Sequence, residues 1–276
     1  MNPITLERII KQALAEDLGM GDWSNQWLFD STTQKSGHFL AKQSGIFSGR
    51  KILEQVYTAL GGGVEVFWSV EDGKAFEKDS VLAKVKGPVS TLLSGERVIL
   101  NLLQHLTGIA STTQDLIQRL DDPDIKVVDT RKTLPGLRMI QKYAVRCGGG
   151  FNHRFRLDDG VMIKDNHIRA AGGIAKAVEM VRKQQGHMIK IEIEVETMNQ
   201  VQQAVDAEVD IIMLDNQTPD QVKQLRKYIP KSIIVELSGG INPDNIAGYK
   251  KCGADVISVG WITHSVKACD ISFYID

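Results

Sequence analysis

Apolar and polar positions follow different patterns in the two halves of the chain. From residue 125 onward, short apolar runs predict strands, which alternate with segments whose apolar residues recur at helical spacing. The strands cover 125–129, 161–164, 189–195, 210–214, 232–237 and 255–259, and the helices cover 171–185, 198–207, 218–228 and 243–251. Such alternation is typical of a parallel sheet with right-handed crossovers. Six strands are too few for an eight-stranded barrel, so the pattern alone leaves an incomplete barrel and an open doubly wound sheet as alternatives.

The first half mixes short strands and helices without regular alternation. Apolar residues at helical spacing predict an amphipathic helix over 4–18. Strand-like segments follow, with a further helix over 48–60, and they cover 38–45, 64–70 and 80–87. Residues 89–120 form a long leucine-rich helical pattern that Gly108 is expected to break. This half therefore indicates a separate α+β domain.

Positive charge is concentrated in one stretch of a nearly neutral chain. The 276 residues carry a formal net charge of -1, with 42% apolar and 24% charged residues. This balance argues against a nucleic-acid or membrane-surface protein, because both need a basic face. Between residues 129 and 169, however, cations outnumber carboxylates: Arg131, Lys132, Arg138, Lys142, Arg146, Arg154, Arg156, Lys164 and Arg169 stand against Asp129, Asp158, Asp159 and Asp165. We expect a small, multiply charged anion as the ligand.

The basic side chains lie where predicted strands end. Arg131 and Lys132 follow the strand 125–129, His153 and Arg154 lie in the next loop, and Lys164 ends the strand 161–164. Parallel α/β proteins build their sites at the carboxyl ends of their strands. The sequence therefore places guanidinium, ammonium and imidazole groups on one rim.

Acidic side chains lie on the neighbouring strands. The segment IKIEIEVE alternates strictly, so Glu192, Glu194 and Glu196 share one face. In a barrel the outer face meets helices and must be apolar, which points these glutamates inward, where they need cations. Lys164 is a candidate partner for Glu194, and a purely structural ion pair is the alternative to a catalytic role. Asp215 ends the next strand.

Glycines follow the last two predicted strands. The segments VELSGGI at 235–241 and VISVG at 256–260 leave backbone amides uncovered. Loops at this place in an α/β barrel often bind phosphate through backbone N–H groups. Two such loops favour a phosphate site over tight turns alone.

Cysteine usage and the N-terminus predict a cytoplasmic protein. Cys147, Cys252 and Cys269 are odd in number and show no CxxC spacing, which argues against a disulfide framework or a structural zinc site. The first residues have neither a signal-peptide layout nor an apolar run long enough to span a membrane. Cys147 is interpreted as a small buried residue at a helix end rather than a reactive thiol.

Four motifs in register resemble one enzyme family. TRKTLPGLR, KYAVRCGGG, NHR and IKDNH are similar in order and spacing to quinolinate phosphoribosyltransferases, and the similarity extends from EDLGMGD to SVGWITHS. The resemblance implies an incomplete, TIM-like α/β barrel with an N-terminal α+β domain. It implies domains of residues 1–108, joined by the C-terminal segment 269–276, and 109–268 for the barrel.

The resemblance also implies roles for individual residues. Quinolinate would be held by Arg131, His153, Arg154 and Lys164, with Arg97 reaching in from the partner of a homodimer. Lys132 would act on the leaving pyrophosphate, and Glu194 and Asp215 would hold ribose hydroxyls and Mg²⁺. Phosphate would meet the glycine-rich loops at Ser238, Gly239, Gly240, Ser258 and Gly260. Lys132, Lys164, Glu194 and Asp215 would be the catalytic set.

The implied reaction transfers a phosphoribosyl group from phosphoribosyl pyrophosphate to quinolinate, with decarboxylation to nicotinate mononucleotide. Three alternatives remain at this point. A paralogue associated with molybdenum transport shares TRKT-type segments. A barrel aldolase could use Lys164 as a Schiff-base amine. A phosphate-ligand sensor on an enzyme-like fold would bind without turnover.

Overall fold

The computed structural model describes residues 1–276, which form two compact units. Unit 1 comprises Met1–Gln114, Thr133–Gly149 and Thr263–Asp276, and unit 2 comprises Asp115–Lys132 and Gly150–Ile262. Residues 133–149, which follow the strand predicted over 125–129, thus belong to unit 1, together with the C-terminal residues 263–276. No helix combines the length and the apolar character that crossing a bilayer requires.

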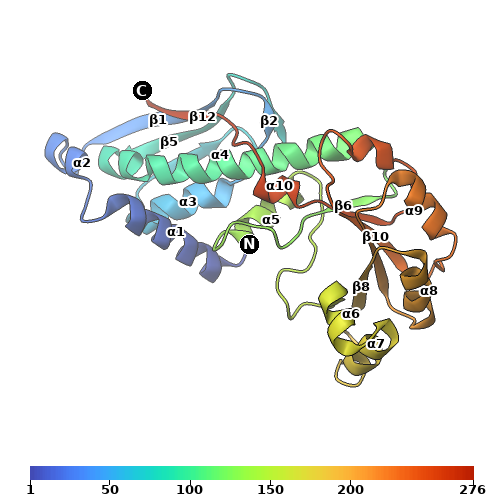
Figure 1. The fold of residues 1–276 in the computed structure, drawn as a ribbon. Coiled ribbons are helices and arrows are strands. Elements are labelled where there is room, and N and C mark those ends of the chain that lie inside the picture. Colours follow the sequence, from blue (N-terminus) through green and yellow to red (C-terminus); the bar gives the residue numbers. More distant parts are fainter. The chain divides into compact units, whose positions relative to one another are not determined.

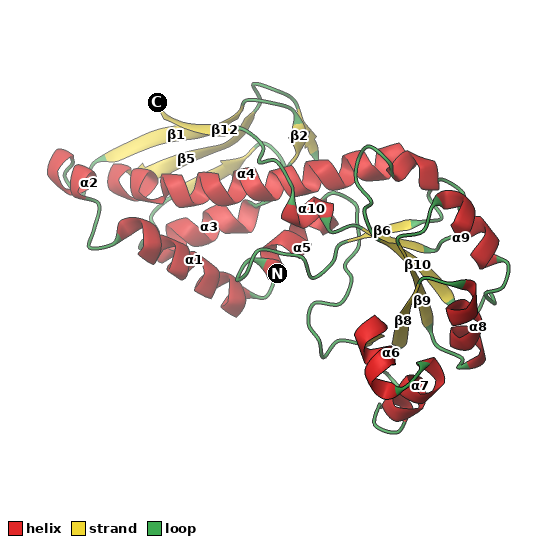
Figure 2. Ribbon diagram, in the orientation of Figure 1, coloured by secondary structure: helices red, strands yellow, loops and turns green.

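Unit 1 is built on an antiparallel sheet in the order β12-β1-β5-β3 (Figures 1 and 2). Its strands are β1 (Gln34–Ala41), β3 (Glu65–Trp68), β5 (Val81–Pro88) and β12 (Ile271–Ile275). The C-terminal strand pairs with β1 from Gly37 opposite Ile275 to Ala41 opposite Ile271, so the expected return of the chain end to the N-terminal domain is confirmed. Two short strands, β2 (Gly45–Ile46) and β4 (Ala75–Phe76), form a separate pair.

Helices complete unit 1. They are α1 (Pro3–Leu18), α2 (Trp23–Leu28), α3 (Arg50–Ala59), α5 (Arg138–Cys147) and the first part of α4 (Val89–Leu120). The α4 side chain of Gln104 donates to the carbonyl of Ile271 on β12, and Gly95 lies against Val56 and Tyr57 of α3. Helix α4 therefore lies between the sheet and α3, as Figure 1 shows.

The predicted break in the long helix is wrong, because α4 runs without interruption through Gly108. A Cβ at Gly108 would lie 2.3 Å from the carbonyl oxygen of Lys267. The glycine allows the backbone leading to β12 to cross the helix closely, and it does not end the helix.

Unit 2 contains a six-stranded sheet in the order β6-β11-β10-β9-β8-β7, and every pair is parallel. All six predicted strands are confirmed: β6 (Lys126–Val128), β7 (Val161–Ile163), β8 (Ile191–Val195), β9 (Ile211–Asp215), β10 (Ile234–Ser238) and β11 (Val256–Ser258). No ladder joins β6 to β7, so the sheet is open on one side and the incomplete α/β barrel is confirmed.

Helices connect these strands. They are α6 (Asp165–Ala171), α7 (Ile174–Arg182), α8 (Met198–Asp206), α9 (Pro219–Arg226) and the short α10 (Trp261–His264), which begins in unit 2. The helix predicted over 171–185 is confirmed as α7 with shorter bounds, and Gly172 and Gly173, with φ angles of 85° and 128°, separate it from α6, which the sequence did not predict. The helix predicted over 243–251 is only a 3₁₀ turn, Ile246–Tyr249.

Candidate active site

The loop with His153 and Arg154 is tied to the end of β6 by a buried carboxylate. Asp129 accepts hydrogen bonds from the side-chain amide of Asn152 (2.5 Å) and from the backbone N–H of His153 (3.0 Å). Phe151 forms a parallel bridge to Val128 just before this point. The loop therefore runs along the open edge of β6 with a fixed backbone.

His153 lies in a buried cluster with two glutamates. Its Nε2 is 3.3 Å from Oε2 of Glu192 on β8 and 3.4 Å from Oε1 of Glu236 on β10. Both glutamates are at least 95% buried, at 5% and 4% exposure. The other ring nitrogen, Nδ1, accepts the backbone N–H of Arg154 at 2.7 Å. Both ring nitrogens are thus engaged.

The hydrogen bond to Nδ1 determines where the ring proton lies. Burial lowers the pKa of His153, but hydrogen bonds and charges of Glu192 and Glu236 outweigh this effect and raise the pKa to about 10. A ring protonated on both nitrogens would lose the Arg154 contact, because Nδ1 then has no lone pair. Nε2 carries a proton in either state. The three residues have the spacing of metal ligands, within 4.8 Å of one another, but a protonated Nε2 does not bind a metal.

Lys164 and Glu194 form the ion pair that the sequence predicts. Lys164 directly follows β7, and its Nζ donates to Oε2 of Glu194 on the adjacent β8. Its backbone N–H donates to Nδ1 of His167 at 3.0 Å, which fixes the start of α6. The Lys164 side chain is 46% exposed and that of Glu194 16%, so the ammonium group lies at the rim and the carboxylate below it.

Asp215 joins this group from the end of β9. Burial raises the pKa of Asp215, the Glu194 and Glu196 carboxylates raise it further, and the charges of Lys164 and Lys132 lower it. Asn216 donates its side-chain amide to Oδ2 of Asp215 at 2.6 Å. The Glu194 and Asp215 carboxylates at the ends of β8 and β9 thus lie within electrostatic range of Lys164 and Lys132.

The two arginines of the rim also lie within electrostatic reach of each other. Burial lowers the pKa of Arg154, and the nearby charge of Arg131 lowers it further, while Glu192 and Asp159 oppose both effects. Arg154 donates from Nη1 to the carbonyl of Gly160 at 2.8 Å, which holds the guanidinium beside the strand β7. Arg131 is exposed. A ligand with two negative groups would relieve this repulsion.

The glycine loops lie at the same strand ends. Ser238 pairs in register with Asp215, and Gly239 and Gly240 follow with φ angles of 96° and 63°. A Cβ at Gly239 would lie 2.2 Å from Oδ1 of Asn216, so only glycine fits there. Ser258 is buried, and its hydroxyl donates to the carbonyl of Leu237, which leaves its main chain for any ligand contact.

Arg97 lies apart from this group in sequence and in unit. It is an exposed residue of α4, within the part of that helix that belongs to unit 1. The neighbouring Glu96 is half-buried, and burial raises its pKa while Arg97 lowers it. An exposed guanidinium on a helix with an apolar face is available to a partner molecule.

The three cysteines are free and poorly suited to reaction. Burial raises the pKa of Cys147, of Cys252 and of Cys269, the last to about 11. Because the thiolate is the reactive form, we expect the native protein to react with a thiol reagent at pH 7 more slowly than free cysteine does. Time courses with and without denaturant check this, and a rapid reaction of Cys147 in the native protein would contradict it.

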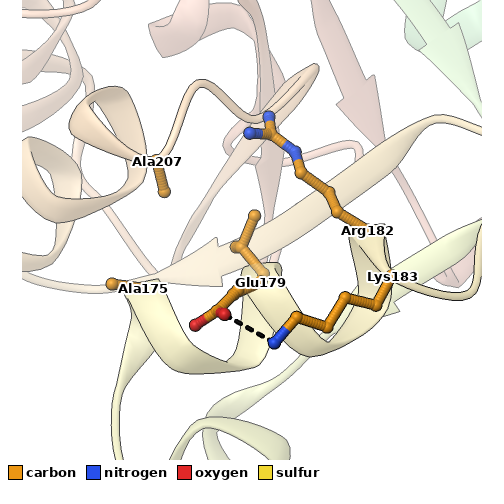
Figure 3. A pocket seen from close by; sticks show the side chains of 6 residues that line it. Ala175, Glu179, Arg182, Lys183 and Ala207 are labelled. Carbon is orange, nitrogen blue, oxygen red and sulfur yellow. Dashed lines mark ion pairs between the residues drawn. The ribbon is translucent and has the colours of Figure 1, made fainter.

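Two surface pockets, one in each unit, are lined by other residues. One belongs to unit 2 and is lined by α7 and neighbouring residues: Ala175, Val178, Glu179, Arg182, Lys183 and Ala207. Figure 3 shows the ion pair between Glu179 and Lys183 across its edge, at 2.6 Å. The other, in unit 1, includes Asp22, Asn25 and Ser94, which are hydrogen-bonded to one another. Neither pocket contains a residue predicted for the site.

Sequence reasoning missed Asp129 and Glu236. Each is a carboxylate at or near the end of an apolar strand, and each is almost fully buried. A buried acidic residue needs a specific partner, so an Asp or Glu inside a short apolar run is the signal that could have identified both.

Comparisons with known proteins identify the family of this chain. The chain matches the model of the quinolinate phosphoribosyl transferase C-terminal domain over residues 109–274 and that of the N-terminal domain over 22–107. It is 46% identical over 272 residues to a protein of Bacillus subtilis (strain 168) named "Probable nicotinate-nucleotide pyrophosphorylase (carboxylating)". That alignment covers 99% of this chain and 94% of the relative.

Solved structures give the same result. The structure of NadC from Streptococcus pyogenes has a TM-score of 0.97 at 38% identity and covers 100% of this chain and 98% of its own. The nicotinate-nucleotide pyrophosphorylase from Francisella tularensis has a TM-score of 0.95 at 36% identity, with the same coverage. Both domain models, the relative and the solved structures match this chain over nearly its whole length. The chain therefore belongs to the quinolinate phosphoribosyl transferase family.

Proposed function

We propose that this protein transfers the phosphoribosyl group of phosphoribosyl pyrophosphate to quinolinate and releases pyrophosphate and carbon dioxide, with nicotinate mononucleotide as the product. The observation that supports this most strongly is the convergence of Arg131, Arg154, Lys164, Glu194 and Asp215 at the ends of parallel strands in unit 2. A dicarboxylate needs the cationic side chains, and a ribose with its metal ion needs the carboxylates, so the reaction requires both sets at one site.

The cationic half of the rim would bind quinolinate. Arg131 and Arg154 each offer a planar fork that matches a carboxylate in two hydrogen bonds, and Lys164 offers a third cation. Each charge-assisted hydrogen bond contributes roughly 1.5 to 3 kcal/mol, which is enough for a dianion to bind after association costs. His153 belongs to this half, and its engaged ring nitrogens give it a supporting role rather than a direct contact.

The acidic half would hold the ribose and Mg²⁺. Glu194 and Asp215 present hard oxygen ligands, and burial, followed by the charge of Glu194, raises the pKa of Asp215, so a cation bound here would stabilise its charged form. The residues therefore fit a magnesium ion shared with substrate phosphates. When bound, the ion would supply charge neutralisation on the leaving pyrophosphate.

The protein's own residues would act around the departing group. Lys132 would pair with the pyrophosphate oxygens as negative charge develops on them. The backbone at Ser238, Gly239, Gly240, Ser258 and Gly260 would hold the phosphate ester, because glycines let a ligand approach the main chain. Arg131, Arg154 and Lys164 would fix the pyridine nitrogen opposite the ribose carbon.

The decarboxylation needs no nucleophile from the protein. Once ribosylated, the ring nitrogen is cationic and stabilises the carbanion that loss of the 2-carboxylate as carbon dioxide leaves, and a proton from solvent would then complete the product ring. The Lys164 ammonium would keep its proton in the ion pair with Glu194, unlike the free amine that Schiff-base chemistry requires.

A homodimer is part of this proposal. The exposed Arg97 would complete the neighbour's quinolinate site, which is consistent with its location in unit 1, outside the rim group. A cytoplasmic location is also part of it, supported by three free cysteines.

The test is a direct assay. The purified protein, quinolinate, phosphoribosyl pyrophosphate and Mg²⁺ should release carbon dioxide and nicotinate mononucleotide in equal amounts. Omission of either substrate, or chelation of the metal, should stop both. Binding of quinolinate without any turnover would contradict the proposal, and so would trapping of a carbonyl substrate on Lys164 by borohydride.

A further inference from the structure

Two buried glutamates of unit 2 have no role in the reaction as described above. Glu192 and Glu236 are buried on β8 and β10; Oε1 of Glu192 has no hydrogen-bond partner, and Oε1 of Glu236 has only the 3.4 Å contact with Nε2 of His153. Burying a carboxylate costs free energy that incomplete hydrogen bonding does not recover. A protein that keeps two such groups in its core gains something other than stability from them.

What the two glutamates share is His153. Nε2 of His153 lies 3.3 Å from Oε2 of Glu192 and 3.4 Å from Oε1 of Glu236, so a proton on this nitrogen has two carboxylate acceptors within reach. These contacts fix which nitrogen carries the proton. The 2.7 Å contact between Nδ1 and the backbone N–H of Arg154 requires a lone pair on Nδ1, so the ring in this arrangement is the neutral tautomer with its proton on Nε2. The chain of contacts therefore runs from the barrel core to the main chain of Arg154.

The remaining contacts show how completely Arg154 is held. Asp129 fixes the two residues before it, the His153 ring fixes its backbone N–H, and Gly160 accepts from its guanidinium. Glu192 also acts through space, because its charge raises the pKa of Arg154 against burial and Arg131. A preorganised arginine loses less freedom on binding a carboxylate than a mobile one does.

We propose that Glu192 and Glu236 are positioning residues that hold the His153 ring, and through it the Arg154 backbone, so that Arg154 meets a carboxylate of the substrate. This inference rests on the proposed function, because the substrate carboxylate is that of quinolinate. Neither glutamate touches the substrate.

The experiment compares two double variants. In Glu192→Met with Glu236→Met, the side chains keep their length and lose their acceptors, so Nε2–H loses both carboxylates. Glu192→Gln with Glu236→Gln is the matched control, since its amide oxygens still accept from Nε2–H. Quinolinate binding is measured by calorimetry without phosphoribosyl pyrophosphate, and KM for both substrates is measured separately.

We expect the methionine pair to weaken quinolinate binding about 10- to 100-fold, the range for one lost charge-assisted hydrogen bond. KM for phosphoribosyl pyrophosphate should change less than about threefold, since the acidic half of the rim is untouched. The glutamine pair should stay within about threefold of wild type in both measurements. Because the methionine pair removes both carboxylate acceptors of the buried Nε2–H, some loss of stability is expected, so the melting temperature is measured and binding is compared on folded protein only.

A thermodynamic cycle tests the route through His153. His153→Ala alone should weaken quinolinate binding as much as the methionine pair does, and combining the three changes should add nothing further. Independent, additive losses would overturn the proposal, and so would wild-type affinity in a folded methionine pair.

Nitrogen NMR of histidine-labelled wild-type protein tests the ring itself, even if the variants fail to fold. A proton on Nε2 and an unprotonated, hydrogen-bonded Nδ1 are expected, and a ring that is unprotonated on Nε2 or protonated on both nitrogens at neutral pH would overturn the inference. The two proposals fail differently. Failure of the wild-type protein to bind quinolinate would contradict the proposed function. Normal turnover in the methionine pair would contradict only the role of the glutamates.

Discussion

Arg131→Ala is expected to lower kcat/KM for quinolinate by about 100- to 10,000-fold, since it removes up to two charge-assisted hydrogen bonds of roughly 1.5 to 3 kcal/mol each. Arg131 is exposed at the end of β6, so its removal creates no cavity, and the melting temperature should stay within a few degrees of wild type. Steady-state kinetics with quinolinate as the varied substrate measure the effect.

A matched control for Arg131→Ala lies in the same basic stretch. Arg156 has a side chain that is 72% exposed and forms ion pairs with Asp158 and Asp159. Arg156→Ala should therefore leave kcat/KM within about twofold, because exposed ion pairs contribute little. Arg131→Lys should fall between the two, since it keeps the charge but loses the planar fork. Full activity of Arg131→Ala would rule out the carboxylate clamp.

The residues of this rim are predictable from the sequence. The hydrophobic periodicity locates the strands, and the residues at the strand ends are then expected on one edge of the parallel sheet. The alternation of IKIEIEVE placed Glu194 on the inner face, and adjacency of successive parallel strands placed Lys164 beside it. Both steps use local pattern and a general rule of parallel sheets. The glycines after β10 were identified in the same way, and the structure shows why Gly239 must be a glycine.

The buried layer below the rim could not be predicted in this way. Glu192 and Glu236 meet at His153 although β9 separates their strands, and that meeting depends on the curvature of the sheet. The helix boundaries failed for a related reason. Gly108 was expected to end a helix, but a tertiary contact with the Lys267 backbone explains the glycine. Where tertiary packing determines which residue is required, the local sequence pattern does not predict its role.

Mixing two inactive variants is expected to restore activity. Arg97→Ala lacks the residue proposed to act in the neighbour's site, and Lys132→Ala lacks one proposed to act within its own. In a mixed dimer, the site of the Arg97→Ala subunit keeps its own Lys132 and receives Arg97 from the partner, so it is intact. The other site lacks both. Random exchange makes half of the dimers mixed, each with one intact site in two, so the mixture should reach about one quarter of wild-type activity.

The same experiment contains its own control. Lys132 and Arg131 follow the same strand, so both act within their own subunit under this proposal. A mixture of Lys132→Ala and Arg131→Ala should therefore stay inactive, because each site of a mixed dimer lacks one of the two. Native mass spectrometry of differently tagged subunits verifies exchange in both mixtures. If Arg97 acted within its own subunit, the first mixture would stay as inactive as the second, and demonstrated exchange without recovery would exclude a site shared between subunits.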